Sequence, residues 1–195
     1  MYSENVIKIY ESENALQRGH FKLSSGKHSS IYLQSAIVLS NPKNLSVIAG
    51  FMVKKIQEVL DLSSIDLVVS PAMGGVIIGN KVGELLNKRS IFLERVEKVF
   101  TLRRGFQINK NDKVLIIEDV ITTGKSSIES AVCVNDFGGK VIGLASIIDR
   151  SSQLLKFNFP FIPVAKIDAP IFSQDEIPDY LKNIPAVKPG SRFIK

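Results

Sequence analysis

One segment of the sequence combines acidic, hydroxyl-bearing and glycine residues in a pattern suited to binding a sugar phosphate. Residues 114–117 are apolar, and the adjacent carboxylates Glu118 and Asp119 follow them. After two more apolar residues, residues 122–126 read Thr-Thr-Gly-Lys-Ser and open a predicted helix. Backbone amides at a helix N-terminus, together with hydroxyls, bind phosphate, whereas carboxylates suit sugar hydroxyls or a magnesium shell. The segment therefore predicts a ligand with a phosphate at one end and a ribose beside it.

Two other interpretations of this segment are weaker. A nucleotide-binding P-loop, GxxxxGK[ST], would need a glycine at position 119, which is Asp. The structural alternative is that Asp119, Thr122 and Thr123 only cap a helix. A lone Asp-Thr pair would favour that alternative, but the whole constellation of carboxylates, hydroxyls and glycine favours a ligand site.

Alternating strands and helices must position this segment. Fully apolar strands that alternate with helices indicate an α/β fold, with a mostly parallel sheet covered on both faces. In such sheets, ligands bind beyond the carboxyl ends of the strands. The predicted strands cover residues 31–39, 66–70, 90–94, 113–118, 140–148 and 164–167, and the predicted helices cover residues 5–17, 44–60, 76–86 and 126–137.

The length and composition indicate one ordinary globular domain over residues 1–195. Hydrophobic residues make up 45% of the chain and charged residues 23%, which excludes disordered and collagen-like classes. Six of the eight prolines follow residue 159, so we expect the tail to wrap irregularly rather than to form a second domain. A single cysteine, Cys133, excludes an internal disulfide and, with only two histidines, a structural zinc cluster.

The charge and the lack of targeting signals limit which partners and which location we expect. Lys and Arg number 25 against 19 Asp and Glu, which favours anionic partners such as nucleic acid, a membrane surface or phosphorylated metabolites. No stretch approaches the roughly 20 apolar residues that span a bilayer, and the N-terminus lacks the order of a signal peptide. We therefore expect a cytoplasmic protein.

Three segments carry a resemblance to a known family. Residues 114–126 resemble the phosphoribosyl diphosphate (PRPP) signature of type I phosphoribosyltransferases. Residues 19–29 resemble the N-terminal segment of orotate phosphoribosyltransferases, and residues 92–106 resemble the stretch with that family's mobile catalytic loop, in its short bacterial form. With residues 70–75 and 148–150 in matching order, the similarity covers roughly residues 15–150.

The resemblance implies a fold, a reaction and an assembly. The fold is that of a type I phosphoribosyltransferase, with a small hood formed by residues 1–40 and the tail. The reaction transfers phosphoribose from PRPP to orotate, giving orotidine 5′-monophosphate and diphosphate in UMP synthesis. Mg²⁺ is the implied cofactor, held mainly by PRPP and water rather than by protein ligands. The implied assembly is a homodimer in which residues 95–105 complete the neighbouring site, with neither nucleic acid nor membrane as a partner.

The resemblance also implies roles at the PRPP site. Glu118 and Asp119 would hold the ribose hydroxyls beside a carbon that becomes oxocarbenium-like as diphosphate leaves. Lys98 completes the predicted catalytic set, and Lys98 and Arg95 would close over the diphosphate and exclude water. The other predicted PRPP contacts are Met73, Gly74, Val120, Ile121, Thr122, Thr123, Gly124, Lys125 and Ser126.

Thr122 and Arg150 are the predicted orotate contacts. Arg150 follows a strand end, and its planar guanidinium suits a carboxylate. The structural alternative is a surface arginine near Asp149. For Arg103 and Arg104, support of the diphosphate and an ordinary surface location remain equally open.

The sequence departs from the family pattern at two places. Many members carry a lysine that contacts PRPP where this chain has Ser24, and Lys27 is a candidate replacement. Longer forms of the catalytic loop carry a histidine, and none occurs between Arg95 and Gly105. The first departure leaves open how this chain contacts PRPP from its N-terminal segment.

Two alternative functions are considered beside orotate transfer. A phosphoribosyltransferase for another base would explain the PRPP signature but not residues 23–28 or Arg150, since uracil and 6-oxopurines have no carboxylate. A regulator that senses PRPP and binds nucleic acid would need an added DNA-binding element or a coherent basic face. The sequence supplies neither.

Overall fold

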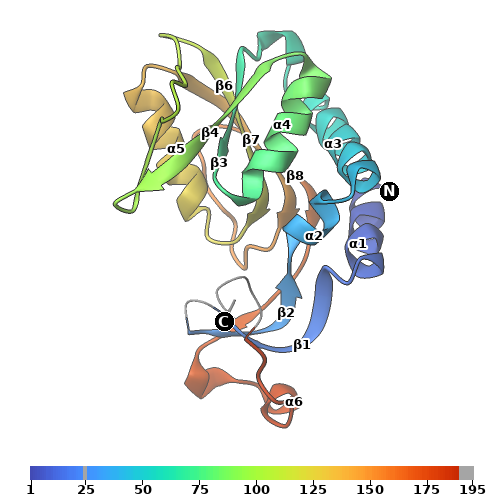
Figure 1. Ribbon diagram of the computed structural model, residues 1–195. Coiled ribbons are helices and arrows are strands. Elements are labelled where there is room, and N and C mark those ends of the chain that lie inside the picture. Colours follow the sequence, from blue (N-terminus) through green and yellow to red (C-terminus); the bar gives the residue numbers. More distant parts are fainter. Residues whose placement is uncertain (24–25, 189–195) are drawn as a thin grey trace.

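The computed structural model describes residues 1–23 and 26–188, and its centre is a six-stranded sheet (Figure 1). Four neighbouring strand pairs are parallel, and only the edge strand β5 runs antiparallel, to β4. The strand order is β5 (Val99–Thr101), β4 (Arg89–Val96), β3 (Leu67–Pro71), β6 (Lys113–Ile121), β7 (Lys140–Asp149) and β8 (Phe161–Lys166). The predicted α/β fold with a mostly parallel sheet is confirmed.

Helices cover both faces of this sheet. Helices α1 (Tyr2–Ser12), α3 (Pro42–Gln57) and α4 (Gly74–Leu86) pack on one face, and α5 (Lys125–Asp136) packs on the other (Figure 1). Two clusters of buried apolar side chains fill the two layers. Every residue of β3 is buried, which is typical of a parallel strand covered on both faces.

The strand order reverses between β3 and β6. From β3 the chain passes through α4 to β4, whereas from β6 it passes through α5 to β7, on the other side of the sheet. The connections that leave β3 and β6 therefore diverge and open a crevice beyond the carboxyl ends of these two strands. The acidic and hydroxyl-rich segment at residues 118–126 lies at the end of β6, so the topology places it at this switch point.

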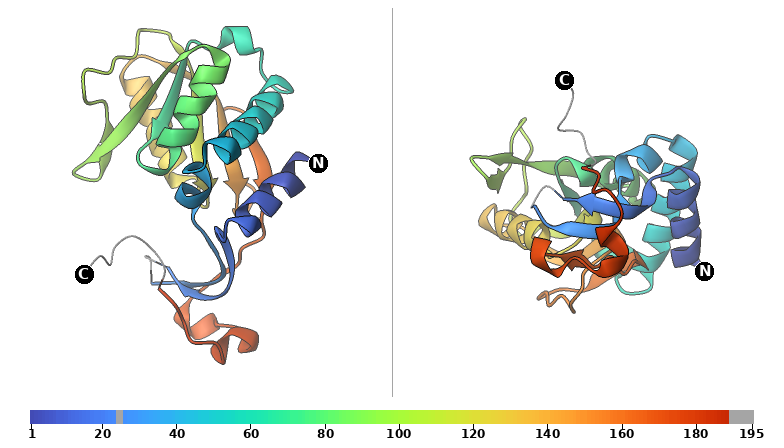
Figure 2. Two further views of the ribbon diagram at one scale, coloured as in Figure 1. Left: turned by 45° about the vertical axis from the view of Figure 1, so that its right-hand side comes forward. Right: turned by 90° about the horizontal axis from the view of Figure 1, so that it is seen from below.

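A second, smaller sheet lies beyond the carboxyl ends of the main strands (Figures 1 and 2). It consists of β1 (Leu16–Lys22), β2 (His28–Leu33) and β9 (Ile171–Phe172), all antiparallel. The short helices α2 (Ser35–Leu39) and α6 (Asp179–Lys182) follow β2 and β9 along the chain. We call the three strands with α6 the hood, a narrower set than the expected residues 1–40 and tail, because α1 packs on the main sheet.

Two predicted elements are wrong in their extent. The strand expected over residues 31–39 ends at Leu33, and residues 35–39 form α2, because Ser35, Val38 and Leu39 are buried together at helical spacing. The helix expected over residues 5–17 ends at Ser12 and a strand begins at Leu16. Asn14 has a φ of 54°, a left-handed conformation that asparagine tolerates and that ends a helix.

Strands β1, β5 and β9 were not expected from the sequence. Strand β5 forms a hairpin with β4 through Glu97 and Lys98, whose φ values of 48° and 71° match a tight two-residue turn. In the part of the chain that the structure describes, no helix combines the length and the apolar character needed to cross a bilayer.

Candidate active site

The turn after β6 forms a small cradle at the start of α5. Gly124 adopts a φ of 72°, and a Cβ there would lie 3.0 Å from the Phe157 ring, so the position suits glycine. The first helical hydrogen bond runs from the Ile128 amide to the Gly124 carbonyl at 2.9 Å, and the amides before it have no partner within the helix. Residues 118 and 120–127 line a cavity of about 70 Å³. We call residues 122–126 the phosphate turn.

Glu118 and Asp119, which we call the acidic pair, point to opposite sides of β6 because side chains alternate along a strand. Glu118 is buried, and its carboxylate accepts a hydrogen bond of 3.2 Å from Ser127 Oγ at the start of α5. Asp119 lies on the α4 side. Its carboxylate fills the space beside Gly74, so a Cβ added to Gly74 would clash with Asp119 Oδ1. The end of β6 therefore brings one carboxylate to each adjoining helix N-terminus.

Burial raises the pKa of both members of the acidic pair. The pKa of Glu118 rises to about 8, first through burial and then through the charge of Asp119, although the Ser127 hydrogen bond opposes the shift. The pKa of Asp119 also rises through burial, which backbone hydrogen bonds and a hydrogen bond from the Ser35 hydroxyl oppose. Two adjacent carboxylates in this environment favour a ligand that brings hydroxyl donors or positive charge.

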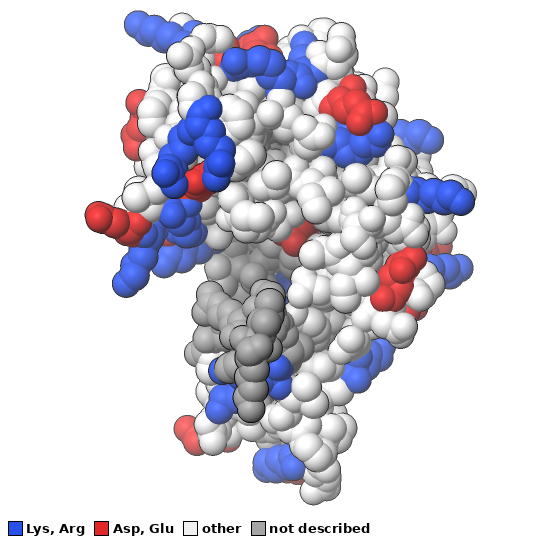
Figure 3. All heavy atoms as spheres, in the orientation of Figure 1, with Lys and Arg blue, Asp and Glu red and all other residues white. Residues whose placement is uncertain are grey.

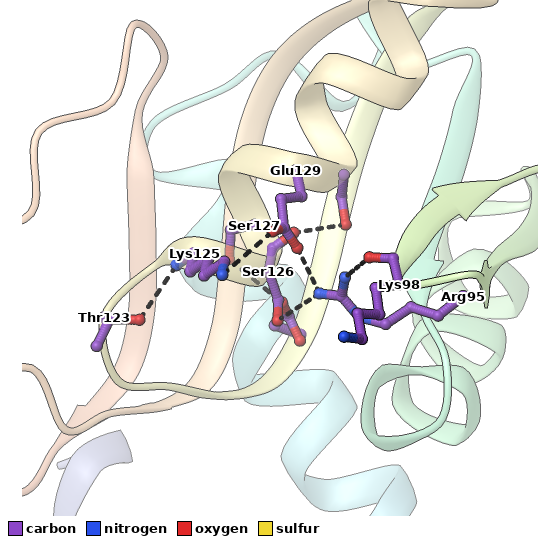
Figure 4. Close-up of polar contacts among 9 residues, drawn as sticks. Arg95, Lys98, Thr123, Lys125, Ser126, Ser127 and Glu129 are labelled. Atoms are coloured by element: carbon purple, nitrogen blue, oxygen red, sulfur yellow. Dashed lines mark hydrogen bonds and ion pairs between the residues drawn. The ribbon is translucent and has the colours of Figure 1, made fainter. Parts of the chain in front are cut away.

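The β4–β5 hairpin brings cations to the same end of the sheet. Arg95 forms an ion pair with Glu129 of α5, lies 3.5 Å from Ser126 Oγ and donates a 2.7 Å hydrogen bond to the Lys98 carbonyl (Figure 4). Its guanidinium also stacks over the Phe100 ring at 3.9 Å. Figure 3 shows Lys and Arg side chains gathered on this side of the molecule. Arg95 is therefore held beside the phosphate turn of its own chain.

Arg103 and Arg104 have a partner of their own. Both form ion pairs with Glu94, at 3.1 Å for Arg103 and with closer contact for Arg104. These arginines lower the pKa of Glu94, with the Arg104 hydrogen bond as the largest cause. In this structure both arginines therefore neutralise Glu94.

Arg150 is a buried cation at the end of β7. It is only 9% exposed, and its Nη2 donates a hydrogen bond of 3.4 Å to Ser29 Oγ in the hood. Its Nε has no hydrogen-bond partner among the described residues. Asp149 instead accepts from the Ser151 amide at 2.8 Å and lies 3.6 Å from Lys166 Nζ. The alternative of a surface arginine beside Asp149 is thus wrong, because the hood covers Arg150.

The structure brings most of the predicted site residues to one end of the sheet. The phosphate turn, the acidic pair, Gly74 and the β4–β5 hairpin meet around the ends of β3 and β6, and Arg150 follows on the next strand. Met73 is 81% exposed at the start of α4. Ser24, whose place in the family pattern belongs to a lysine, lies outside the described residues.

Several residues of the site were not predicted from the sequence. Ser127 hydrogen-bonds to Glu118, and Glu129 forms an ion pair with Arg95. Ser29 hydrogen-bonds to Arg150, and Ser35 lies next to Asp119. Ser127 and Glu129 follow the signature at helical spacing and were within reach of a sequence argument. Ser29 and Ser35 come from the distant N-terminal segment, and only the fold shows their contacts.

The donors present suit a metal carried by a ligand better than a protein cage. Among residues 1–23 and 26–188, no three His, Cys, Asp or Glu side chains lie close enough together to hold a metal ion. The acidic pair supplies two carboxylates on opposite sides of β6, which can meet the water shell of a ligand-bound Mg²⁺.

Comparison with known proteins assigns the family. A model described as a phosphoribosyl transferase domain matches residues 34–180. A curated protein of Erythrobacter litoralis, named orotate phosphoribosyltransferase, is 45% identical over 192 residues, which cover 98% of this chain and 99% of that protein. One of Sphingopyxis alaskensis with the same name is 44% identical over 195 residues, covering 100% and 99%. The chain belongs to the orotate phosphoribosyltransferase family. The resemblance seen over residues 15–150 is thus confirmed and extends along nearly the whole chain.

Solved structures agree on the fold. The orotate phosphoribosyltransferase of Aeropyrum pernix superposes with a TM-score of 0.70 at 24% identity, covering 83% of this chain and 93% of that one. An adenine phosphoribosyltransferase of Trypanosoma brucei superposes with a TM-score of 0.61 at 18% identity, covering 97% and 88%. Because relatives named for different bases share the fold, the fold alone does not select the base.

Proposed function

We propose that this protein transfers phosphoribose from PRPP to orotate, giving orotidine 5′-monophosphate and diphosphate in pyrimidine nucleotide synthesis. The bond from the ribose C1 to a diphosphate oxygen breaks, a bond from C1 to a ring nitrogen of orotate forms, and the proton of that nitrogen is released to the diphosphate. The observation that carries the proposal is the meeting of three groups at one end of the sheet. These are the phosphate turn, the acidic pair and a buried arginine with a free Nε.

The phosphate turn binds the 5′-phosphate in this proposal. The amides at the start of α5, the hydroxyls of Thr122, Thr123 and Ser126, and the left-handed Gly124 allow a phosphate to approach the backbone closely. The positive end of the helix dipole adds to this attraction. Lys125 is exposed and supplies further positive charge at the rim, and Val120 and Ile121 connect the turn to the acidic pair.

The acidic pair holds the ribose and stabilises the transition state. Ribose hydroxyls donate hydrogen bonds to Glu118 and Asp119, which offsets the cost of burying these carboxylates. As the bond to diphosphate breaks, positive charge develops at C1, and a carboxylate nearby is worth more there than in the ground state.

Cations and the β3–α4 turn receive the diphosphate. Met73 and Gly74 offer backbone amides at the start of α4, next to Asp119. Arg95 exchanges Glu129 for the diphosphate, and Lys98 at the hairpin tip closes over it and excludes water. In the proposed homodimer, residues 95–105 complete the neighbouring site, so Arg95 leaves Glu129 of its own chain and meets the diphosphate bound by the partner subunit.

The orotate ring lies between the phosphate turn and the hood. Arg150 pairs with the orotate carboxylate through its unpartnered Nε and a terminal nitrogen, a planar geometry that suits a carboxylate. Thr122 lies on the other side of the ring, after the last residue of β6. Burial lowers the pKa of Arg150, because it disfavours the charged guanidinium. A bound carboxylate offsets this cost.

Mg²⁺ is the proposed cofactor and the cytoplasm the proposed location. Glu118 and Asp119 would hold the water shell of an ion bound to PRPP, which would supply positive charge for the leaving diphosphate.

The direct test is to mix the purified protein with PRPP, Mg²⁺ and orotate and to follow the loss of orotate absorbance. Uracil, hypoxanthine and adenine are tested in parallel, and a chelator is added at the end. We expect turnover with orotate alone that stops when the metal is removed. Turnover with another base would contradict the role of Arg150, and tight PRPP binding without turnover would contradict the transferase function.

A further inference from the structure

Two buried histidines connect the β1–β2 hairpin to residues 183–188, which we call the tail segment. His20 lies in β1 and His28 begins β2, and the sequence contains only these two histidines. Both side chains are buried. His20 Nε2 lies 2.6 Å from His28 Nδ1, and His20 Nδ1 lies 2.8 Å from the Ile184 carbonyl oxygen. The two rings therefore form one hydrogen-bonded chain that ends on the tail segment.

The Ile184 carbonyl fixes where the protons of this chain lie. A carbonyl oxygen only accepts, so His20 Nδ1 carries a proton and donates it. In a neutral ring the other nitrogen is then an acceptor, so His28 Nδ1 donates to His20 Nε2. His28 Nε2 is left without a proton, and it is buried with no hydrogen-bond partner among the described residues. The chain is complete while both rings are neutral.

An added proton disrupts this arrangement. On His20 Nε2 it would face the proton that His28 Nδ1 carries. On His28 Nε2 it would be buried, with no acceptor in the part of the chain that the structure describes. In agreement, burial lowers the pKa of His28, and the charges of His20 and Lys22 lower it further. The geometry therefore favours two neutral rings.

The other charged groups around the pair lie on the hood and its connecting segments. The Glu176 carboxylate accepts a hydrogen bond from Ser173, and the Asp179 carboxylate pairs with Lys182. These two carboxylates are therefore engaged away from the imidazoles. The remaining charged residues of these segments are Arg18, Lys27, Asp168, Asp175 and Lys188.

The pair lies on the strand that holds Arg150. Val187 of the tail segment pairs with β1 through two backbone hydrogen bonds of 2.8 Å, and β9 pairs with β2 at His28 and Ser29. Ser29 Oγ accepts the hydrogen bond from Arg150. Because side chains alternate along a strand, His28 and Ser29 point to opposite faces of β2. The histidines thus fix one face of β2 while the other face contacts Arg150.

We propose that His20 and His28 form a clamp, which holds the tail segment on the β1–β2 hairpin while both rings are neutral and so positions Ser29 over Arg150. The inference rests on the proposed role of Arg150 in orotate binding. As the pH falls below about 6.5, protonation opens the clamp, because the released rings bind protons more tightly than the clamped ones. The hood then loosens, and orotate binds more weakly than before while PRPP does not.

Amide hydrogen exchange measured by NMR tests the clamp directly. Protection factors, which correct for the intrinsic pH dependence of exchange, are compared at pH 5.5 and 7.5 for the Val187 and Lys22 amides, with amides of β6 as the reference for global unfolding. We expect Val187 and Lys22 to lose protection at the lower pH, by at most about tenfold per pH unit for each proton bound. Equal protection of these amides at both pH values would overturn the inference.

Two conservative variants separate titration from packing. In His28→Asn, the side-chain amide can donate to His20 Nε2 or, rotated by half a turn, accept from it once His20 is protonated. Its protection should therefore change little between pH 7.5 and 5.5. Lys22→Gln removes a charge that lowers the pKa of His28, so protection should be lost at higher pH than in the wild type, with the exposed Lys8→Gln as the control. A wild-type pH dependence in His28→Asn would contradict the clamp.

Kinetics connect the clamp to the site. His20→Phe keeps a ring but breaks both hydrogen bonds, so at pH 7.5 we expect the KM for orotate to rise about threefold to tenfold, with kcat and the Kd for PRPP near wild type. His28→Asn should match the wild type at pH 7.5 and have the lower KM at pH 5.5. Equal losses of affinity for orotate and PRPP would contradict the positioning of Arg150. If the wild type does not convert orotate at any pH, the proposed function fails instead, and the exchange data still test the clamp.

Discussion

The phosphate turn and the proposed orotate side of the site are built in different ways. The phosphate turn and the acidic pair come from nine consecutive residues, 118–126, that leave one strand and enter one helix. The orotate side joins Arg150 to Ser29, which are 121 residues apart in the chain. The phosphate side depends on local backbone geometry, while the orotate side depends on how the hood packs against the sheet. Neighbouring residues suffice for the phosphate side, whereas the proposed orotate side requires distant segments to meet.

The largest expected effect concerns the phosphate side of the site, which neighbouring residues form. Asp119→Asn keeps the shape but removes the charge, so we expect kcat/KM to fall roughly 100-fold or more, as when a preorganised electrostatic group is lost. Tm should not fall, because burial already disfavours the ionised carboxylate. Steady-state kinetics and thermal unfolding measure both, with the exposed Asp136→Asn as the control. A large drop in Tm would make Asp119 a structural residue.

Arg150→Ala tests the side that the tertiary structure assembles. We expect the KM for orotate to rise roughly 100-fold, since one partner of a buried charge pair is removed, while the Kd for PRPP stays near the wild-type value. Isothermal titration with PRPP and kinetics with varied orotate separate the two effects. Arg18→Ala, which removes an exposed ion pair with Glu11, is the control. An equal loss of affinity for orotate and for PRPP would contradict a separate orotate side.

Gly74→Ala tests the contact between the turn after β3, which contains Gly74, and the end of β6, which carries Asp119. The added methyl would meet the Asp119 carboxylate and displace it, so we expect kcat/KM to fall about tenfold to 100-fold with the fold intact. Gly50→Ala is the matched control, because nothing lies within 4 Å of a Cβ there and the change should stabilise α3 slightly. Activity of Gly74→Ala equal to that of Gly50→Ala would show that the Asp119 carboxylate tolerates displacement.

A separate effect concerns stability and pH in the absence of ligand. The folded pKa of Glu118, about 8, lies above its ordinary value of 4.5, so the folded state binds more protons than the unfolded state between these values. Stability should therefore fall as pH rises from about 5 to about 8, by at most about 1.4 kcal/mol per pH unit from this group.

Glu118→Gln should flatten this dependence, because glutamine does not titrate. Urea unfolding at pH 5, 6.5 and 8 measures it, with the exposed Glu58→Gln as the control. A slope unchanged by Glu118→Gln, or stability that rises over this range, would contradict the burial of a protonated Glu118.

Most of the main sheet could be predicted from the sequence, since buried parallel strands are short apolar runs and their helices show apolar spacing. The prediction failed in the N-terminal segment. There, residues 35–39 resemble a strand in composition, yet they form a helix whose buried side contains Ser35 and Val38. Strand β5, and with it the β4–β5 hairpin, was missed because the strand has only three residues and the turn depends on two left-handed residues.

The sequence by itself determined the local chemistry of this protein. The order of apolar strand, acidic pair, hydroxyls and glycine at residues 114–126 already specifies a strand end with a phosphate turn, because each step involves neighbours in the chain. Only the tertiary structure decided what holds that chemistry in place. Burial of Arg150 under the hood joins residues 121 positions apart, Arg150 and Ser29. Such contacts arise from packing between elements, which a local pattern does not encode.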